Sequence, residues 1–291
     1  MRIKETLYVY RDGKIRVTVK PHEYLYFDIS KAWFLRRAKG YMGELILNEE
    51  FLTVTFRFKQ HETEIKGRIA WDCNERSIDG FNPDIGWVRI DLTKLFHIHR
   101  VYELKRGRLQ SEASKKHSLR KVLEKYSRRE RNRAKDFLHK LTTSLAKSFK
   151  GYIHGFEDLN KENMFGRSKR RNRNVAKSDW KTVIKLMSYK SKVVLLNPKN
   201  TSKTCSRCGR VNAPKGAVYE CECGLVIDRQ LNASINLYLQ MEGLPPSPKV
   251  FKDLMRGWSG FTLTGDEAYD SSNELERSLR LVNPKSYVVI T

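Results

Sequence analysis

Residues 1–66 show the period-two pattern of apolar and polar positions that predicts β-strands. Ile15, Val17 and Val19 alternate with polar residues, and the Asp12-Gly13 pair before them is typical of a tight turn between strands. Further apolar stretches of strand length follow up to residue 58. Short strands with aromatic and basic residues favour an oligonucleotide-binding barrel, although a β-sheet scaffold with an aromatic core has the same pattern.

From residue 67 onward the pattern predicts long apolar strands and helices. One apolar strand ends near Asp72, and a second, over residues 152–157, ends in Glu157. Between them, residues 112–150 repeat apolar positions at helical spacing and predict one long helix that Gly151 ends. We therefore expect an α/β fold.

Shorter elements follow the second strand. The pattern predicts a short helix over residues 178–187, a buried strand over 193–196 and a helix over 231–242. His97 and His99 fall in a predicted strand or loop, and we interpret them as surface or core polar residues.

Four of the five cysteines lie in one short window. Cys205 and Cys208 form a Cys-x-x-Cys pair, Cys221 and Cys223 form a tighter pair, and a glycine follows each pair. Two thiolate pairs on glycine-containing turns are what a tetrahedral structural zinc site needs. Four free or disulfide-bonded cysteines remain the alternative.

The charge of the chain is strongly positive, since 57 Lys and Arg face 33 Asp and Glu and leave a formal net charge of +24. Such a charge attracts polyanions, of which nucleic acid is the commonest, although a generally basic protein would have it too. The sequence has no membrane-spanning apolar run and no signal peptide. Because thiolate ligands also imply a reducing compartment, we expect an intracellular, cytoplasmic protein without a membrane partner.

Basic residues concentrate in two segments. The predicted helix over 112–150 has a basic face, which we interpret as a phosphate-contact surface rather than a solvated face. Residues 166–177 lack periodicity and predict either a loop that orders on nucleic acid or a plain disordered linker. The fourteen basic residues predicted to contact nucleic acid are Lys115, Lys116, Arg120, Lys121, Lys125, Arg128, Arg129, Arg131, Arg133, Arg167, Lys169, Arg170, Arg171 and Arg173.

The segment around the cysteines carries a family resemblance. Asn-Pro-x-x-Thr-Ser-x-x-Cys-x-x-Cys-Gly, a second cysteine pair and Asp-Arg-x-x-Asn-Ala resemble the C-terminal part of TnpB, the transposon-encoded RNA-guided DNA nuclease related to type V CRISPR effectors. The resemblance implies a RuvC-type, RNase H-like domain with an inserted zinc ribbon. It divides the chain into a wedge-like β-domain at 1–66, a first RuvC part at 67–200, the ribbon at 201–226 and a last RuvC part with a tail at 227–291. We find no helical recognition module before residue 66, so the resemblance does not cover the usual N-terminal portion.

The resemblance also implies three carboxylates that hold magnesium for two-metal cleavage of a phosphodiester bond. Asp72 and Glu157 fit the first two positions. We interpret Asp79, Asp84 and Asp91 as turn residues instead.

The third acid is the unusual position. It belongs directly before x-Asn-Ala, where this chain has Gln230. Asp228 lies two residues earlier and substitutes for it if the segment is extended, whereas in a helix it faces elsewhere or serves only as an N-cap.

Three functional hypotheses follow. The first is an RNA-guided DNA endonuclease with guide RNA and target DNA as partners, zinc in the ribbon, and Asp72, Glu157 and Asp228 on magnesium. The second is a nuclease-dead, guide-directed DNA-binding protein, and the third is an inactive truncated transposon remnant. The sequence has no phosphate-binding glycine loop, dinucleotide fingerprint or Ser/His/Asp pattern, which argues against nucleotide hydrolysis and acyl transfer.

Overall fold

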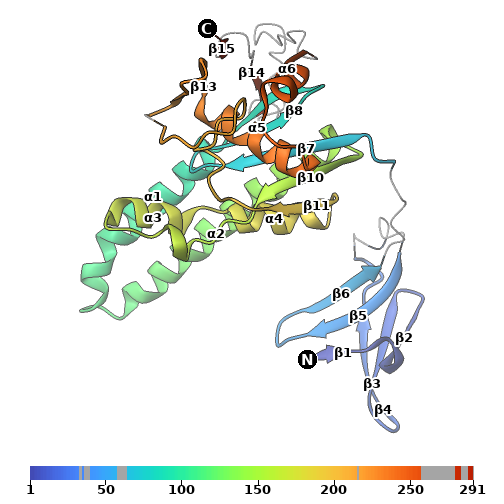
Figure 1. Cartoon of the computed structure of the whole chain (residues 1–291). Coiled ribbons are helices and arrows are strands. Elements are labelled where there is room, and N and C mark those ends of the chain that lie inside the picture. Colours follow the sequence, from blue (N-terminus) through green and yellow to red (C-terminus); the bar gives the residue numbers. More distant parts are fainter. Residues whose placement is uncertain are drawn as a thin grey trace, which may run out of the picture. The chain divides into compact units, whose positions relative to one another are not determined.

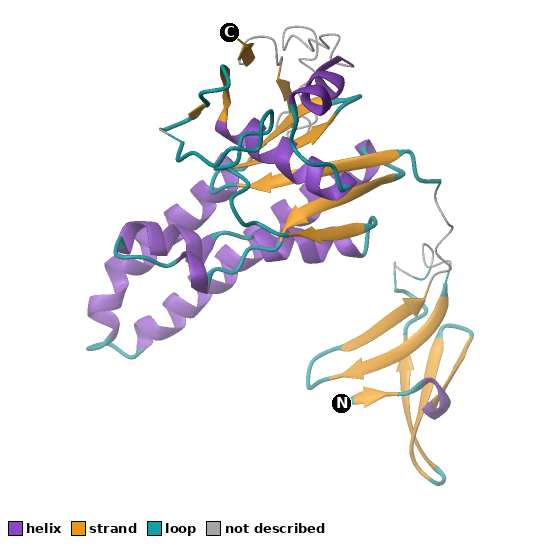
Figure 2. Cartoon of the chain, viewed as in Figure 1, coloured by secondary structure: helices purple, strands orange, loops and turns teal. Residues whose placement is uncertain are grey.

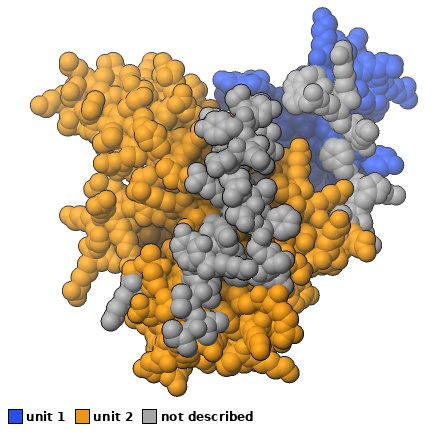
Figure 3. Space-filling model, turned by 90° about the horizontal axis from the view of Figure 1, so that it is seen from above, with its two compact units in different colours: residues 1–63 blue, residues 64–291 orange. Residues whose placement is uncertain are grey.

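The computed structural model describes residues 1–32, 35, 40–57, 64–214 and 216–256, together with the backbone of 279–282 and 288–290 (Figure 1). The chain divides into two compact units, residues 1–63 and 64–291, which are coloured separately in Figure 3. Each unit is considered by itself.

The N-terminal unit contains two three-stranded sheets. The first sheet consists of β2 (Tyr8–Arg11), β3 (Lys14–Lys20) and β4 (Glu23–Asp28), and the second of β1 (Arg2–Ile3), β5 (Tyr41–Leu47) and β6 (Leu52–Arg57). The short 3-10 helix η1 (Glu5–Leu7) joins β1 to β2. No strand pairing joins the two sheets in the described part of this unit, so the oligonucleotide-binding barrel predicted for this region is not shown.

The predicted alternation accounts for the core of this unit. Ile15 and Val17 point inward and pack with Ile3 and Leu45. Asp12 and Gly13 have φ angles of 47° and 77°, which is the left-handed backbone that a two-residue hairpin turn requires at both positions.

A mixed six-stranded sheet forms the centre of the C-terminal unit (Figure 2). Its order is β11 (Val193–Leu196), β10 (Tyr152–Glu157), β7 (Gly67–Cys73), β8 (Ser77–Asn82), β9 (Gly86–Asp91) and β14 (Leu279–Val282). β10 runs parallel to both β7 and β11, whereas β8 is antiparallel to β7 and β9, and β14 is antiparallel to β9.

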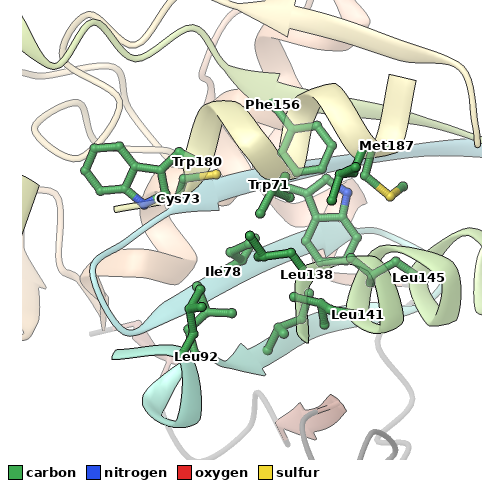
Figure 4. Close-up of a cluster of buried hydrophobic side chains, with 14 of the residues drawn as sticks. Trp71, Cys73, Ile78, Leu92, Leu138, Leu141, Leu145, Phe156, Trp180 and Met187 are labelled. Carbon is green, nitrogen blue, oxygen red and sulfur yellow. The ribbon is translucent and has the colours of Figure 1, made fainter. Parts of the chain in front are cut away.

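One face of this sheet packs on helices. These are α1 (Thr93–Ala113), α2 (Ser118–Ser148) and α4 (Trp180–Ser188). Trp71 and Phe156 point to this side and pack with Leu138, Leu145 and Met187 (Figure 4). Gly80 is required here, because a Cβ atom would lie 2.3 Å from the Trp71 ring.

The opposite face is covered by α5 (Arg229–Glu242), where Leu237 packs with Ala70 and where Leu231 and Ile235 pack with Phe81. Gly243 ends the helix in the left-handed conformation, as C-terminal glycines commonly do. Helices on one face and α5 on the other confirm the predicted α/β fold.

The remaining elements lie around the cysteines and the basic segment. β12 (Val218–Glu220), β13 (Leu225–Asp228) and β15 (Val288–Ile290) form a small antiparallel sheet. The chain also contains η2 (Glu162–Met164), α3 (Lys169–Lys177) and α6 (Pro248–Arg256). None of the described helices is both long and apolar enough to cross a membrane.

Three predicted elements differ from the structure. The single helix predicted over 112–150 is the end of α1 and the whole of α2, which are separated by a break at residues 114–117. Residues 169–177 form α3 rather than a loop, because Ser168 caps the helix through Arg171 N–H and Val175 anchors it in the core. Strand β11 lies at the edge of the sheet, where Val194 and Leu195 are exposed rather than buried.

Candidate functional site

Asp72 and Glu157 lie at the ends of the parallel neighbours β7 and β10. The strand register pairs Trp71 with Phe156, so the following acids are adjacent. Since Trp71 and Phe156 face α2, alternation along the strands turns Asp72 and Glu157 toward the α5 side. Asp72 is 7% exposed and Glu157 is 4% exposed, so both carboxyl groups are buried on neighbouring strands.

Burial dominates the electrostatics of this pair. It raises the pKa of Asp72 well above its ordinary value, and the charge of Glu157 raises that pKa further. Burial also raises the pKa of Glu157, against hydrogen bonds from Thr201, Asp72 and the backbone N–H of Cys73. A bound divalent cation favours the ionised form of both carboxyl groups and would oppose these rises. Two carboxylates without a Lys or Arg partner among the described residues are a donor set suited to a hard cation such as magnesium.

Polar side chains hold both acids in place. Thr201 Oγ1 donates to Glu157 Oε1 at 2.7 Å, and Asn74 Nδ2 donates to Asp72 Oδ2 at 2.6 Å. The backbone of Asn74 is itself held in place, because its backbone carbonyl oxygen accepts a hydrogen bond from Trp180 Nε1 at 2.9 Å.

Asp79 lies in the same buried cluster, and its predicted place in a turn was wrong. It is a fully buried residue of β8 and stands directly opposite Asp72. Ser77 Oγ donates to Asp79 Oδ2 at 2.6 Å, and Arg89 Nε donates to Asp79 Oδ1 at 2.7 Å. Burial raises the pKa of Asp79, and Arg89 partly opposes that rise. The Asp-Gly pair suggested a turn, and the apolar residues Ile78 and Phe81 are three apart, so alternation gave no signal for this strand.

Asp228 is the last residue of β13 and the N-cap of α5. Its Oδ1 accepts hydrogen bonds from the backbone N–H groups of Gln230 at 2.8 Å and Leu231 at 3.3 Å. Arg89 Nη2 lies 3.7 Å from the same oxygen. Asp228 therefore caps the N-terminus of α5, as the second alternative predicted. Arg89 lies between Asp228 and Asp79 and contacts both carboxylates. In the described part of the chain, Asp72, Glu157 and Asp228 do not form a group whose carboxylate oxygens all lie within 4.8 Å of one another.

The four clustered cysteines converge on one point. Their sulfurs all lie within 4.8 Å of one another, and none forms a disulfide. Cys205 and Cys223 sulfurs are 3.7 Å apart, and those of Cys208 and Cys221 are 3.6 Å apart. A tetrahedral zinc–thiolate site with bonds of about 2.3 Å separates its sulfurs by about 3.8 Å, so the cluster fits a metal ion of this kind.

Helix α5 fixes the loop that carries the first cysteine pair. Asn232 Oδ1 accepts from Ser206 N–H at 3.0 Å, and Asn232 Nδ2 donates to the Thr204 carbonyl at 2.7 Å. Asn236 Nδ2 donates to the carbonyls of Thr201 at 2.8 Å and Thr204 at 2.7 Å. The sequence placed Asn232 in the Asp-Arg-x-x-Asn-Ala motif without a reason, which these bonds supply, and Asn236 lies outside that motif.

A basic cleft of about 1260 Å³ opens beside the carboxylates. It is lined by α1, α3, the start of α5 and Asn74, whose amide contacts both Asp72 and Asp79. Its basic residues are Arg76, Arg100, Lys169, Arg170, Arg171, Arg173, Lys177 and Arg229, against the acids Glu75, Glu103 and Asp179.

The fourteen basic residues predicted to contact nucleic acid are all exposed. Nine lie on α2 or in the turn before it, four lie on α3, and Arg167 directly precedes the Ser168 cap. Within the described part of the chain, only Arg173 of this set has an acidic partner, Glu103 at 3.7 Å. Their positive charge is therefore largely available to an anionic ligand.

His99 lies in α1 and not in a strand or loop, and it has acidic partners that the sequence did not reveal. Its Nδ1 lies 2.8 Å from Glu130 Oε1 and its Nε2 lies 2.9 Å from Asp179 Oδ2. Burial lowers the pKa of His99, but the two carboxylates raise it by more. Arg106 also donates to Glu130, so the cluster links α1, α2 and the start of α4. His97, on the same helix, is exposed.

Comparison with known proteins assigns the chain to a family. Residues 180–237 match the family model described as "Cas12f1-like, TNB domain". TnpB-like protein MJ0012 of Methanocaldococcus jannaschii is 38% identical over 169 residues, which cover 57% of this chain and 77% of the relative. The chain belongs to the TnpB family.

TnpB-like protein MJ1635 of the same organism is 38% identical to this TnpB chain over 275 residues, which cover 92% of this chain. The chain spans 64% of the length of that relative. A solved Cas12f1-sgRNA-target DNA complex aligns with a TM-score of 0.44 and 18% identity, over 79% of this chain and 68% of the Cas12f1 chain.

Proposed function

We propose that this TnpB chain is a metal-dependent DNA endonuclease directed by a guide RNA. The observation that carries the proposal is the meeting of Asp72 and Glu157 on neighbouring parallel strands, buried and without a basic partner among the described residues. The order β9-β8-β7-β10-β11, with β8 antiparallel, supports a RuvC-type, RNase H-like domain in which the central strand carries the first acid.

Asp72 and Glu157 would hold divalent ions through their carboxylate oxygens. When bound, magnesium supplies an activated water and stabilises the leaving oxygen of the phosphodiester. Asn74 keeps Asp72 oriented, and Thr201 keeps Glu157 oriented. The four thiolates would hold zinc as a structural ion of the ribbon.

In this proposal Asp228 remains the third metal-binding carboxylate, and Asp79 is the alternative candidate for that role. Asp228 would have to leave its cap and Arg89 to reach the pair, whereas Asp79 already shares Asn74 with Asp72. A neutral amide such as Gln230 supplies no charge to a cation.

Guide RNA and target DNA are the proposed partners. Support comes from family membership, from the net charge of +24 and from the fourteen exposed basic residues, four of which line the cleft. Phosphate contacts of this kind position a nucleic acid without reading its sequence, which a guide would supply.

A nuclease-dead, guide-directed DNA-binding protein is the second candidate. Gln230 at the third position and the engagement of Asp228 with Arg89 favour it. Both candidates share the same nucleic-acid surface, so only cleavage separates them.

The test is magnesium-dependent cleavage of double-stranded DNA by the ribonucleoprotein purified with its native flanking transcript. Cleavage that disappears in Asp72→Ala and Glu157→Gln supports the endonuclease. Cleavage lost in Asp228→Asn but kept in Asp79→Asn assigns the third acid to Asp228, and the reverse assigns it to Asp79. Guide-dependent binding without any cleavage by the wild type overturns the endonuclease in favour of the binding protein.

A further inference from the structure

Thr201 connects the loop that carries Cys205 and Cys208, called here the cysteine loop, to the carboxylate pair Asp72 and Glu157. Its hydroxyl donates to Glu157 Oε1 at 2.7 Å, whereas its other acceptor, the Pro198 carbonyl, is farther away at 3.3 Å. A threonine hydroxyl has one proton to donate, so the shorter contact with the carboxylate takes it. With Oε1 bonded in this way, the Glu157 carboxylate is fixed in one orientation beside Asp72.

The backbone that carries Thr201 is fixed by the same helix that fixes the cysteine loop. Asn236 Nδ2 bonds the carbonyls of Thr201 and Thr204, and Asn232 bonds Thr204 and the N–H of Ser206. Ser206 follows Cys205 directly, so one hydrogen-bonded segment runs from the thiolate cluster to Glu157.

We propose that Thr201 is a positioning residue that orients Glu157 for divalent-ion binding and links its position to the loop that carries Cys205 and Cys208. The inference rests on the proposed role of Asp72 and Glu157 as ligands of a divalent ion. β-Branching makes the Thr201 side chain stiff at χ1, which suits a hydroxyl that must hold one direction. Partners of this kind orient metal-ligating carboxylates, and their loss commonly weakens metal binding about 10- to 100-fold.

The experiment measures Mn²⁺ binding to the full zinc-loaded chain by electron paramagnetic resonance, without nucleic acid, alongside zinc content and melting temperature. Thr201→Val removes the hydroxyl at constant shape, and Thr201→Ser retains it. Ser202→Ala is the matched control, because the Ser202 hydroxyl has no hydrogen-bond partner among the described residues. We expect Thr201→Val to weaken Mn²⁺ binding about tenfold with zinc content unchanged. Thr201→Ser and Ser202→Ala should stay within about threefold of the wild type.

Four results would overturn the inference. Wild-type Mn²⁺ affinity in Thr201→Val is the first, and equal weakening by Thr201→Ser and Thr201→Val is the second. Loss of zinc or of the folded state in Thr201→Val is the third, since it assigns Thr201 a purely structural role. A wild type that binds no Mn²⁺ is the fourth, and it removes the proposed function as well. DNA cleavage by the wild type together with unchanged binding in Thr201→Val removes the inference alone.

Discussion

At the residue scale, three buried acids differ in how their charge is compensated. Asp79 has Arg89 as a partner, whereas Asp72 and Glu157 have hydrogen bonds and each other. A buried carboxylate pair without a cation is destabilising, because burial and the neighbouring charge both oppose ionisation. Destabilising buried carboxyl groups of this kind are typical of functional sites, where activity is retained at the expense of folding stability.

This property predicts that Glu157→Gln stabilises the protein in magnesium-free buffer at neutral pH. The amide keeps the shape and the acceptor for Thr201 but removes the charge that raises the pKa of Asp72. We expect a gain of about 1–2 kcal/mol, or a few degrees in melting temperature. Calorimetry with zinc retained measures it, with the exposed Glu162→Gln as control. A lower melting temperature for Glu157→Gln would contradict this account of the pair.

His154 is a second buried group with an electrostatic cost. Trp71 Nε1 donates to its Nδ1 at 3.0 Å, and its Nε2 has no hydrogen-bond partner in the described structure. Burial lowers the pKa of His154 to about 4 from 6.5. The unfolded chain therefore binds the proton first as the pH falls below 6.5, and stability is lost from there down to about pH 4.

The corresponding prediction compares the wild type with His154→Gln, which retains an acceptor for Trp71. Between pH 7 and pH 5 the unfolding free energy of the wild type should fall relative to the variant by on the order of 2 kcal/mol. The comparison is needed because the pKa values of Asp72 and Glu157 are raised. These two groups therefore make the protein more stable as the pH falls, which opposes the loss that comes from His154. Urea denaturation at the two pH values measures the difference, and a constant difference would refute the assignment to His154.

At the element scale, the basic helix α3 shows where local pattern was insufficient. Residues 169–177 have almost no apolar periodicity, and Val175 is the one residue of this helix that is buried. Tertiary contacts hold the helix, because Lys177 pairs with Glu103 of α1 at 2.6 Å. The break between α1 and α2 was missed because residues 114–117 are Ser-Lys-Lys-His and contain neither glycine nor proline to mark the end of a helix.

If α3 contacts phosphates, a double change of Arg170 and Arg171 to alanine should weaken nucleic-acid binding and lower its salt dependence. The slope of log affinity against log salt should fall by about two, one for each lost phosphate contact. Fluorescence anisotropy with a short duplex over a salt series measures the slope. Lys249→Ala/Lys252→Ala on α6 is the matched control of equal charge loss. An identical slope for both double variants would remove α3 from the contact surface.

The cysteine loop should depend on its ion. Binding of a structural metal ion contributes directly to folding free energy, so Cys208→Ser should release zinc and lower the melting temperature. We expect zinc per chain, measured by atomic absorption, to fall from one toward zero with Cys208→Ser. The fifth cysteine, Cys73, lies in the main core, and Cys73→Ala should keep the zinc. Retention of zinc by Cys208→Ser would mean that the four sulfurs do not act as one site.

At the scale of the whole molecule, the sequence predicted the α/β class and the strand ends that carry Asp72 and Glu157. Those features follow from local periodicity and from motifs that the chain carries intact. It did not predict that Asp79 faces Asp72, that Arg89 separates Asp79 from Asp228, or that the tail supplies β14 to the sheet. Each depends on which strands pair, and pairing between distant segments leaves little local signal.

The central claim is that Asp72 and Glu157 together hold a divalent ion. Anomalous diffraction from crystals of the zinc-loaded protein soaked in manganese tests it directly. We predict a manganese peak within ligand distance of oxygens from both carboxylates, separate from the zinc peak at Cys205, Cys208, Cys221 and Cys223. Manganese that is absent from the two carboxylates at saturating concentration would contradict the account.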